Sequence, residues 1–169
     1  MPVTRLNHAV LYVRDVDASV AFYASTLGFK TVVAFPGAAF LQANGSNNDH
    51  DLGLFQIGAQ AGDSGAGRTT VGLYHLAWEV DTLDELAATR QRLAEAGALA
   101  GATDHGTTKA LYAKDPDGIE FEVSWLVPAD QLTQEVLHSR KSMSPLNLEA
   151  EIARFGGQTL GGIGISINA

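Results

Sequence analysis

The sequence contains no cysteine among its 169 residues, which excludes disulfide bonds and thiolate metal sites. Any metal ion would have to be held by histidine and carboxylate side chains. No stretch approaches the roughly 20 apolar residues of a membrane span, and the first ten residues hold no basic segment that leads into a long apolar run. We therefore expect a cytoplasmic protein that has no membrane partner.

Basic residues are scarce as well, because 11 Lys and Arg stand against 19 Asp and Glu, a formal net charge of −8. Nucleic acids and anionic membranes are bound through basic patches, so this charge argues against both partners. The chain has instead 46% hydrophobic residues and 18 glycines, which suit a buried core with strands and tight turns. At this length we expect one domain, or two small repeats that share a core.

One order of elements, strand, helix and three strands, is predicted twice, within residues 1–60 and 70–126. In the first copy, a strand at 7–13 precedes a helix that Asp15 or Asp17 would cap and Gly28 would end. The helix would bury an apolar stripe of Val16, Val20, Tyr23 and Leu27. The pattern predicts an α+β fold of two tandem βαβββ modules, with a curved mixed sheet around a cup.

Residues 127–169 lie outside the repeat and are expected to form a C-terminal extension. They contain a candidate short helix at 147–155 and a glycine-rich tail. The tail could reach a partner subunit or remain mobile.

Two histidines occupy equivalent places in the two copies. His8 is third in LNHAVLYV (6–13) and His75 is third in LYHLAWEV (73–80). Strand alternation puts His8 on one face with Val10 and Tyr12. In IEFEVSW (119–125) it separates three apolar side chains from the face that carries Glu120 and Glu122.

Two imidazoles and one carboxylate on one face of a metal ion are the ligand set of non-heme Fe(II) oxygenases. His8, His75 and either Glu120 or Glu122 could supply it, leaving positions free for a substrate and dioxygen. A single histidine of this kind is more often an ordinary half-buried polar residue. Two at matched repeat positions, with a strand carboxylate, favour the metal site.

The paired repeat, together with NHAVLYVRDVDASVAFYASTLGF and KDPDGIEFEVSW, resembles the vicinal oxygen chelate superfamily over residues 6–126. That group includes glyoxalase I, fosfomycin-resistance proteins, bleomycin-binding proteins and type I extradiol dioxygenases. The resemblance implies metal ligands at His8, His75 and Glu122, since the family's carboxylate follows the glycine of this turn, Gly118, by four residues. Fe(II) is the metal it favours, with Mn(II) or another divalent ion as an alternative.

The resemblance also implies three catalytic residues. His50 corresponds to the acid–base histidine of the dioxygenases, although Asp49-His50 replaces the family's doubled histidine. Tyr112 lies ten residues before Glu122, as a tyrosine does in those enzymes, and His105 lies shortly before it. Taken alone, each of the three could be an ordinary turn or core residue.

The function favoured by this resemblance is that of an extradiol dioxygenase, which opens a catechol-like ring with O2. Many such enzymes have two paired repeats of this kind, and this sequence has one, so we expect a homodimer in which residues 127–169 help to cover the exposed sheet edge and surface. An isomerase of the glyoxalase or epimerase kind would add a fourth ligand on the fourth strand. Strict alternation places Gln56 there, on the face of His50. A binding protein without metal would have lost the ligands. Residues expected to line the cup are Val10, Tyr12, Phe40, Leu54 and Trp78, although strand alternation places Trp78 on the helix side.

Overall fold

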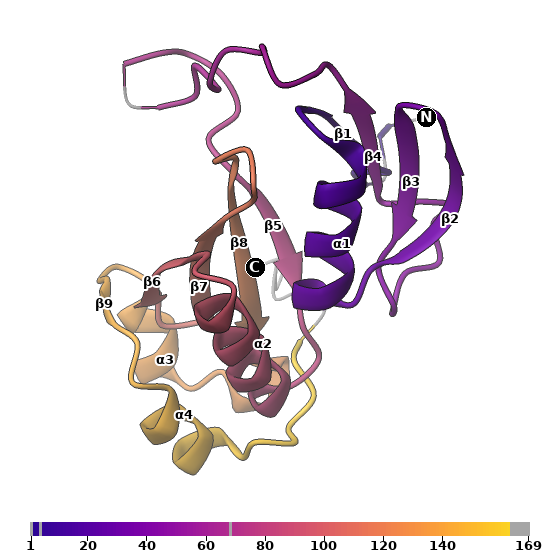
Figure 1. The fold of residues 1–169 in the computed structure, drawn as a ribbon. Coiled ribbons are helices and arrows are strands. Elements are labelled where there is room, and N and C mark those ends of the chain that lie inside the picture. Colours follow the sequence, from indigo (N-terminus) through magenta and orange to yellow (C-terminus); the bar gives the residue numbers. More distant parts are fainter. Residues whose placement is uncertain (1, 4, 68, 163–169) are drawn as a thin grey trace. The chain divides into compact units, whose positions relative to one another are not determined.

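The computed structural model describes residues 2–3, 5–67 and 69–162, and the chain divides into two compact units. The first unit comprises Met1–Gly65 together with Asp115–Ile119, and the second comprises Ala66–Lys114 and Glu120–Ala169. Each unit contains one βαβββ module (Figure 1). The predicted α+β class and the tandem repeat are therefore confirmed, and each module forms its own mixed sheet.

The first module combines one helix with a four-stranded sheet in the order β1-β4-β3-β2, in which β1 and β4 are parallel. Leu11 and Val13 are buried, whereas Val10 and Tyr12 are 51% and 71% exposed, so the predicted alternation is confirmed. The helix covers one face of the sheet, and we call the opposite face the open face. The elements are β1 (Ala9–Val13), α1 (Val16–Leu27), β2 (Lys30–Phe35), β3 (Ala38–Gln42) and β4 (Leu52–Gln56).

Helix α1 begins and ends where the sequence predicts. The Asp15 carboxylate accepts hydrogen bonds from the first free N–H groups of the helix, and Gly28 ends it at a φ of 72°, which favours glycine. The buried face is rotated from the predicted stripe, since Ser19 and Thr26 are buried in place of Val20 and Leu27. The Thr26 hydroxyl donates to the Phe22 carbonyl one turn earlier, which makes its burial tolerable.

The second module repeats this architecture with five strands in the order β5-β8-β7-β6-β9. Helix α2 packs against β6, β7 and β8, and the face away from it is the open face of this sheet. Phe121, Val123 and Trp125 are at most 1% exposed, as alternation along β8 predicts. The elements are β5 (Leu76–Glu79), α2 (Leu83–Glu95), β6 (Leu99–Asp104), β7 (Thr108–Lys114) and β8 (Glu120–Leu126).

The C-terminal extension packs on the second module (Figure 1). Strand β9 (Ser144–Pro145) pairs with the edge of β6, and α4 (Leu148–Phe155) forms where a short helix was predicted and contacts α2. Two shorter helices, η1 (Ala129–Gln131) and α3 (Gln134–Ser139), precede them. The Trp125 indole donates to the Thr159 carbonyl at 3.2 Å, so the tail up to residue 162 is tied to β8. The end of the predicted tail, 163–169, lies outside the described residues.

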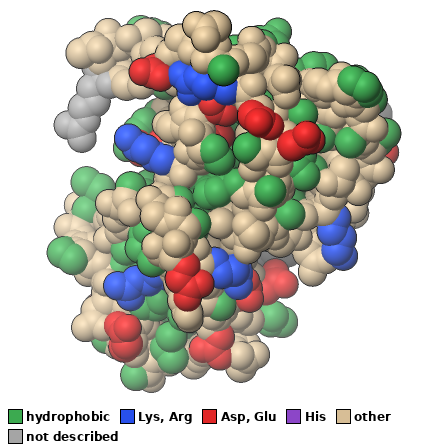
Figure 2. Space-filling view, viewed as in Figure 1, with side chains coloured by type: hydrophobic (Ala, Val, Ile, Leu, Met, Phe, Trp, Pro, Cys, Tyr) green, Lys and Arg blue, Asp and Glu red, His purple; other side chains and the backbone are tan. Residues whose placement is uncertain are grey.

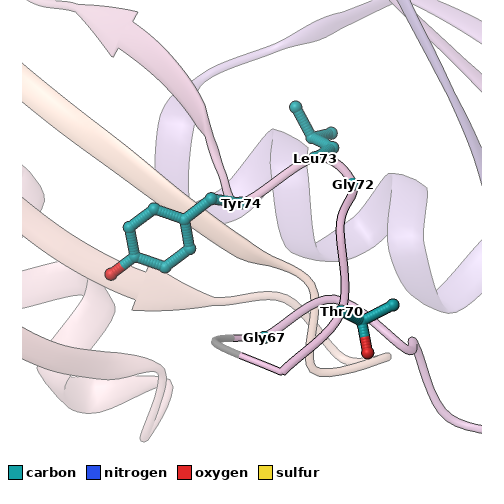
Figure 3. Close-up of a pocket in the computed structure, with 5 residues that line it drawn as sticks. All are labelled: Gly67, Thr70, Gly72, Leu73 and Tyr74. Atoms are coloured by element: carbon teal, nitrogen blue, oxygen red, sulfur yellow. The ribbon is translucent and has the colours of Figure 1, made fainter.

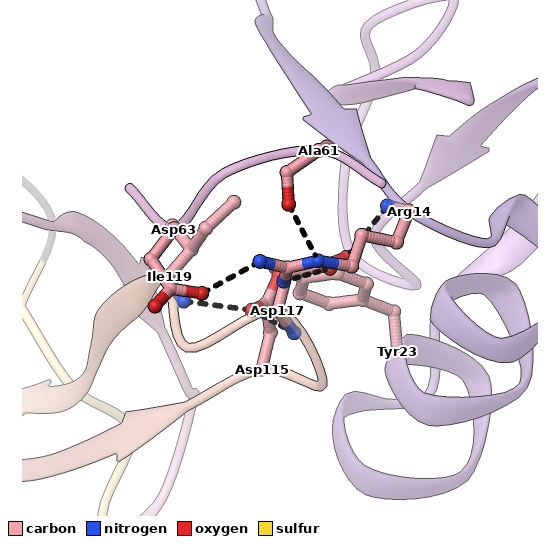
Figure 4. Close-up of polar contacts among 7 residues, drawn as sticks. All are labelled: Arg14, Tyr23, Ala61, Asp63, Asp115, Asp117 and Ile119. Atoms are coloured by element: carbon pink, nitrogen blue, oxygen red, sulfur yellow. Dashed lines mark hydrogen bonds and ion pairs between the residues drawn. The ribbon is translucent and has the colours of Figure 1, made fainter. Parts of the chain in front are cut away.

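The turn DPDG between β7 and β8 belongs to the first unit (Figure 4). Arg14 binds Asp117 through its backbone N–H at 3.1 Å and its guanidinium at 2.9 Å, and it also reaches Asp63 at 2.6 Å. Asp115 is 5% exposed and accepts the Tyr23 hydroxyl at 3.2 Å. Its other oxygen accepts N–H groups of the turn itself. The DPDG motif is therefore a hydrogen-bonded turn that is anchored by the buried Asp115.

Charged side chains of both signs lie among hydrophobic ones on the face shown in Figure 2. Exposed ion pairs such as Arg92–Glu85 and Arg90–Glu149 contribute little to stability. In the part of the chain that the structure describes, no helix is both long and apolar enough to cross a membrane.

Candidate metal centre and catalytic residues

The first module brings two predicted site residues together, His8 and His50. His8 directly precedes β1 and is exposed, and its ring centroid lies 4.6 Å from that of His50. The His50 ring also contacts Phe40, at 4.9 Å between centroids, so it lies on the open face. His50 Nδ1 is 2.8 Å from the Asp49 carboxylate, which orients the ring and leaves Nε2 to face away.

The rest of this open face is apolar and aromatic. Phe40 contacts the rings of Phe35 and Phe55 at 6.1 and 5.8 Å between centroids. Val10 and Tyr12 lie exposed beside them on β1. Leu54, by contrast, was expected to line the cup but is fully buried on the helix side, where it pairs with Leu11. That expectation was wrong.

The second module brings together His75 and Glu122. His75 Nε2 lies 3.3 Å from Glu122 Oε2, and the two side chains are 23% and 13% exposed. His75 Nδ1 is buried and has no hydrogen-bond partner among the described residues. An imidazole with an unused buried nitrogen beside a carboxylate fits a divalent-metal donor set. Glu120, the alternative carboxylate, makes no such ion pair with His75 in the described residues.

Tyr112 and His105 lie next to this pair. The Tyr112 hydroxyl is 2.8 Å from His105 Nε2, and Tyr112 is directly opposite Glu122 in the β7–β8 pairing. Burial, followed by the charge of Glu122 and a hydrogen bond with it, raises the pKa of Tyr112 to about 12. The Tyr112 ring is 5.8 Å from that of His75. Four of the predicted site residues therefore form one continuous group in the second module.

The strand registers show which positions correspond in the two modules. Gly53 on β4 pairs with Val10 and Phe40, and Glu122 on β8 pairs with Ala77 and Tyr112. His8 and His75 each lie two residues before the β1 or β5 member of these pairs. The counterpart of Glu122 in the first module is therefore Gly53. Since glycine has no side chain, this position supplies no metal ligand.

Gln56, considered as a fourth ligand on the face of His50, does not lie on that face. Its side-chain oxygen accepts the Val16 N–H at the start of α1, at 3.2 Å. The prediction was wrong because it counted the alternation of side chains from His50, whereas strand β4 and its regular alternation begin only at Leu52. Before it, the Asp51 carboxylate is held by the loop through Ala43 N–H and the Ser46 hydroxyl.

The predicted ligands are divided between the two units, His8 in the first and His75 with Glu122 in the second. No group of three or more His, Asp or Glu side chains that could hold one metal ion occurs in residues 2–3, 5–67 and 69–162. The three-ligand set therefore remains a prediction.

A cavity of about 250 Å³ lies in the segment that leads to β5 (Figure 3). Gly67, Thr70, Gly72, Leu73 and Tyr74 line it, and it includes none of the predicted site residues. The Tyr74 ring packs against the ring of His75, at 4.6 Å between centroids. The segment thus contributes a neighbour to His75.

Sequence reasoning missed Lys109, which is 1% exposed and forms ion pairs with Asp104 and Glu151. The sequence did contain a sign of this burial. Along β7, Lys109 alternates with Leu111 and Ala113 on the face that packs against the helix. A charged residue in such a place requires a buried partner.

Comparison with known proteins agrees with this architecture. Residues 5–123 match the Glyoxalase/Bleomycin resistance protein/Dioxygenase superfamily, so the chain belongs to this family. It is 32% identical to the Catechol-2,3-dioxygenase of Bacillus subtilis (strain 168) over 120 residues, which are 71% of this chain and 41% of that protein. It is also 32% identical to the Biphenyl-2,3-diol 1,2-dioxygenase 3 of Rhodococcus globerulus over 142 residues, 79% and 70% of the two chains.

Among solved structures, the fold is similar to that of a glyoxylase/bleomycin resistance protein/dioxygenase domain from Frankia sp. EAN1pec. The TM-score is 0.60 and the identity 25%, over 73% of this chain and 98% of the other. The chain spans less than half the length of the Bacillus relative. These similarities establish the family of the chain, whereas its reaction depends on the residues of the site.

Proposed function

We propose that this protein is an extradiol-type dioxygenase that uses Fe(II) and O2 to cleave a catechol-like aromatic ring. His8, His75 and Glu122 would hold the metal, within one functional domain over residues 1–126. The relatives named as dioxygenases of catechol and biphenyl-2,3-diol support this choice. Mn(II) or another divalent ion could occupy the same donor set.

The observation that carries the proposal is Gly53 at the first-module position that corresponds to Glu122. A four-ligand isomerase site would need a donor on β4, and neither Gly53 nor Gln56, which binds the start of α1, provides one. Three ligands leave coordination positions free for two adjacent substrate oxygens and for dioxygen. When bound, the metal would supply a Lewis acid and template for these reactants.

The remaining site residues would bind the substrate and move its protons. His50, oriented by Asp49, would take a proton from a catechol hydroxyl through Nε2 and return it later, since an imidazole can do both near neutral pH. Tyr112 keeps its proton over the physiological range and can donate a hydrogen bond to a substrate oxygen. His105 would act beside it. The aromatic open face of the first module would bind the ring.

We also propose a homodimer. Strand β2 is an edge of the first sheet, and Val32, Val33 and Phe35 on it are each about half exposed. Such an edge is usually covered in a soluble protein. Light scattering after gel filtration should give twice the mass of the chain for the unmodified protein. The Val33→Lys variant should give the mass of a single chain.

The test of the function is oxygen uptake by protein purified without air, loaded with Fe(II) and offered a panel of substituted catechols. We expect one O2 consumed for each ring-opened product. If protein that holds a divalent metal consumes no oxygen, the dioxygenase is excluded and an isomerase is favoured. If it neither consumes oxygen nor binds a metal, a binding protein is favoured.

A further inference from the structure

A buried lysine links the C-terminal extension to the loop that carries His105. Lys109 Nζ lies 2.7 Å from Asp104 Oδ1, at the end of β6, and 2.8 Å from Glu151 Oε2 on α4. The Phe155 ring, one turn further along α4, covers the ammonium group at 5.6 Å. Lys109 is 1% exposed and the two carboxylates are 21% and 12% exposed. A charge so buried is retained only where partners compensate its desolvation.

Asp104 connects Lys109 to the backbone next to His105. The same Oδ1 atom that binds Lys109 accepts the Gly106 N–H at 2.7 Å. The loop is closed by the His105 N–H, which donates to the Thr108 carbonyl at 2.9 Å. The conformation of residues 104–108 therefore depends on a carboxylate whose charge Lys109 balances.

The C-terminal extension contacts the same loop at two further points. Gly106 has a φ of +79°, and a Cβ there would clash with Ser139 Oγ and lie 2.7 Å from the Arg140 backbone nitrogen, so α3 lies directly against it. Strand β9 pairs with Asp104 through Ser144. With Glu151, these contacts surround the loop with residues from α3, β9 and α4.

We propose that Lys109 and Glu151 are positioning residues, through which the C-terminal extension holds His105 in place against Tyr112. The distance that this arrangement sets is the 2.8 Å between His105 Nε2 and the Tyr112 hydroxyl. The inference rests on the proposed function only where His105 acts on a substrate, because the positioning itself is a property of the second module.

The test compares two substitutions on α4. Glu151→Gln removes the buried partner of Lys109, and Glu149→Gln removes an 82% exposed partner of Arg90 by the same chemical change. The readout is the ring-nitrogen NMR signals of His105 in histidine-labelled protein, assigned with His105→Gln. We expect Glu151→Gln to shift these signals and Glu149→Gln to leave them as in the unmodified protein.

The kinetic expectation follows from the same geometry. In enzyme that cleaves catechols, Glu151→Gln should lower kcat by up to about 100-fold through misplacement of His105, with a smaller change in KM. Glu149→Gln should keep the original rate. Unchanged His105 signals in folded Glu151→Gln would overturn the proposal, as would equal shifts in both variants.

A second variant covers the case in which Glu151→Gln does not fold. Lys109→Met combined with Glu151→Leu replaces both members of this ion pair by apolar side chains, so neither Lys109 nor Glu151 is left as an unpaired buried charge. It leaves Asp104 without its cation, so the His105 signals should still shift, and unchanged signals would overturn the proposal. Because the signals need neither metal nor catechol, they report on positioning even if the proposed reaction fails.

Discussion

The open faces of the two modules are built on the same strand register but carry opposite chemistry. In the first, the Val10–Gly53–Phe40 row is apolar, and aromatic rings lie around it. In the second, the corresponding row is Ala77–Glu122–Tyr112, in which Glu122 contacts His75 and Tyr112 contacts His105 through their polar side chains. Both modules carry a histidine, His8 or His75, two residues before the β1 or β5 member of the row.

The difference shows that two copies of one backbone can present different chemistry on corresponding faces. An apolar aromatic face suits a ring, whereas clustered carboxylate, imidazole and phenol groups suit a metal and the polar atoms of a substrate. The shared histidines would be ligands from both halves, and only one half would add the carboxylate. Substitutions in each module test this assignment.

Removing the carboxylate of the second module should have the largest effect. We expect Glu122→Ala, like His8→Ala and His75→Ala, to weaken metal binding by more than the roughly 10- to 100-fold that loss of an outer partner costs. Metal content after dialysis and competition with a chelator measure this. Glu120→Ala is the matched control. Metal loss in Glu120→Ala with full retention in Glu122→Ala would reverse the assignment.

His50→Ala should separate catalysis from metal binding in the first module. We expect metal content to be kept and turnover to fall by about 100- to 10,000-fold, the usual contribution of a general acid–base group. Metal analysis and oxygen uptake on the same sample give both values. Release of the metal would instead identify His50 as a ligand and favour a four-ligand site.

Gly53→Glu would give the first module the carboxylate that it lacks. We expect metal binding to persist and oxygen uptake to fall, because a fourth donor would fill a position that the substrates need. A Cβ at this position lies 3.3 Å from Phe40 and Val10, so Gly53→Ala is the control for crowding. If both variants lose activity equally, crowding alone explains the effect.

Tyr23→Phe should destabilise the turn that belongs to the first unit. Tyr23 is 2% exposed, and its hydroxyl donates a hydrogen bond to the buried Asp115 carboxylate. Because the substitution removes this donor, the free energy of unfolding should fall by about 1–3 kcal/mol. Tyr12→Phe, at a 71% exposed position of the same module, should change it by less than about 0.5 kcal/mol. Urea unfolding of both variants measures the difference, and equal effects would contradict the role of the buried contact.

The smallest effect concerns pH. Burial raises the pKa of Asp115 in the folded protein, so the folded state keeps a proton that the unfolded state has already released. The stability contributed by this group is thus present below the unfolded pKa and is lost as pH rises through the folded one. Asp115→Asn should remove this part of the slope. An unchanged slope in urea unfolding between mildly acidic and neutral pH would contradict it.

Much of the fold follows from local patterns. Alternation on β1 and β8, the Asp15 cap and the Gly28 end of α1 all occur as predicted. These features depend on one or two turns of backbone and on whether a side chain is apolar, so neighbouring residues suffice to predict them. The equivalent histidines could be found for the same reason, because a repeat is visible in sequence.

Tertiary structure alone decided the other features. Leu54 and Gln56 lie on the helix side of the sheet because regular alternation begins only after the loop at Asp51. The end of this loop cannot be found from residue spacing alone. The Lys109 cluster joins β6, β7 and α4, and the pairing of Glu122 with His75, rather than Glu120, depends on side-chain reach between strands. Contacts between residues distant in the chain are selected by the packing of the whole module. For that reason the repeat and its candidate ligands are visible in the sequence, whereas packing selects which side chains meet.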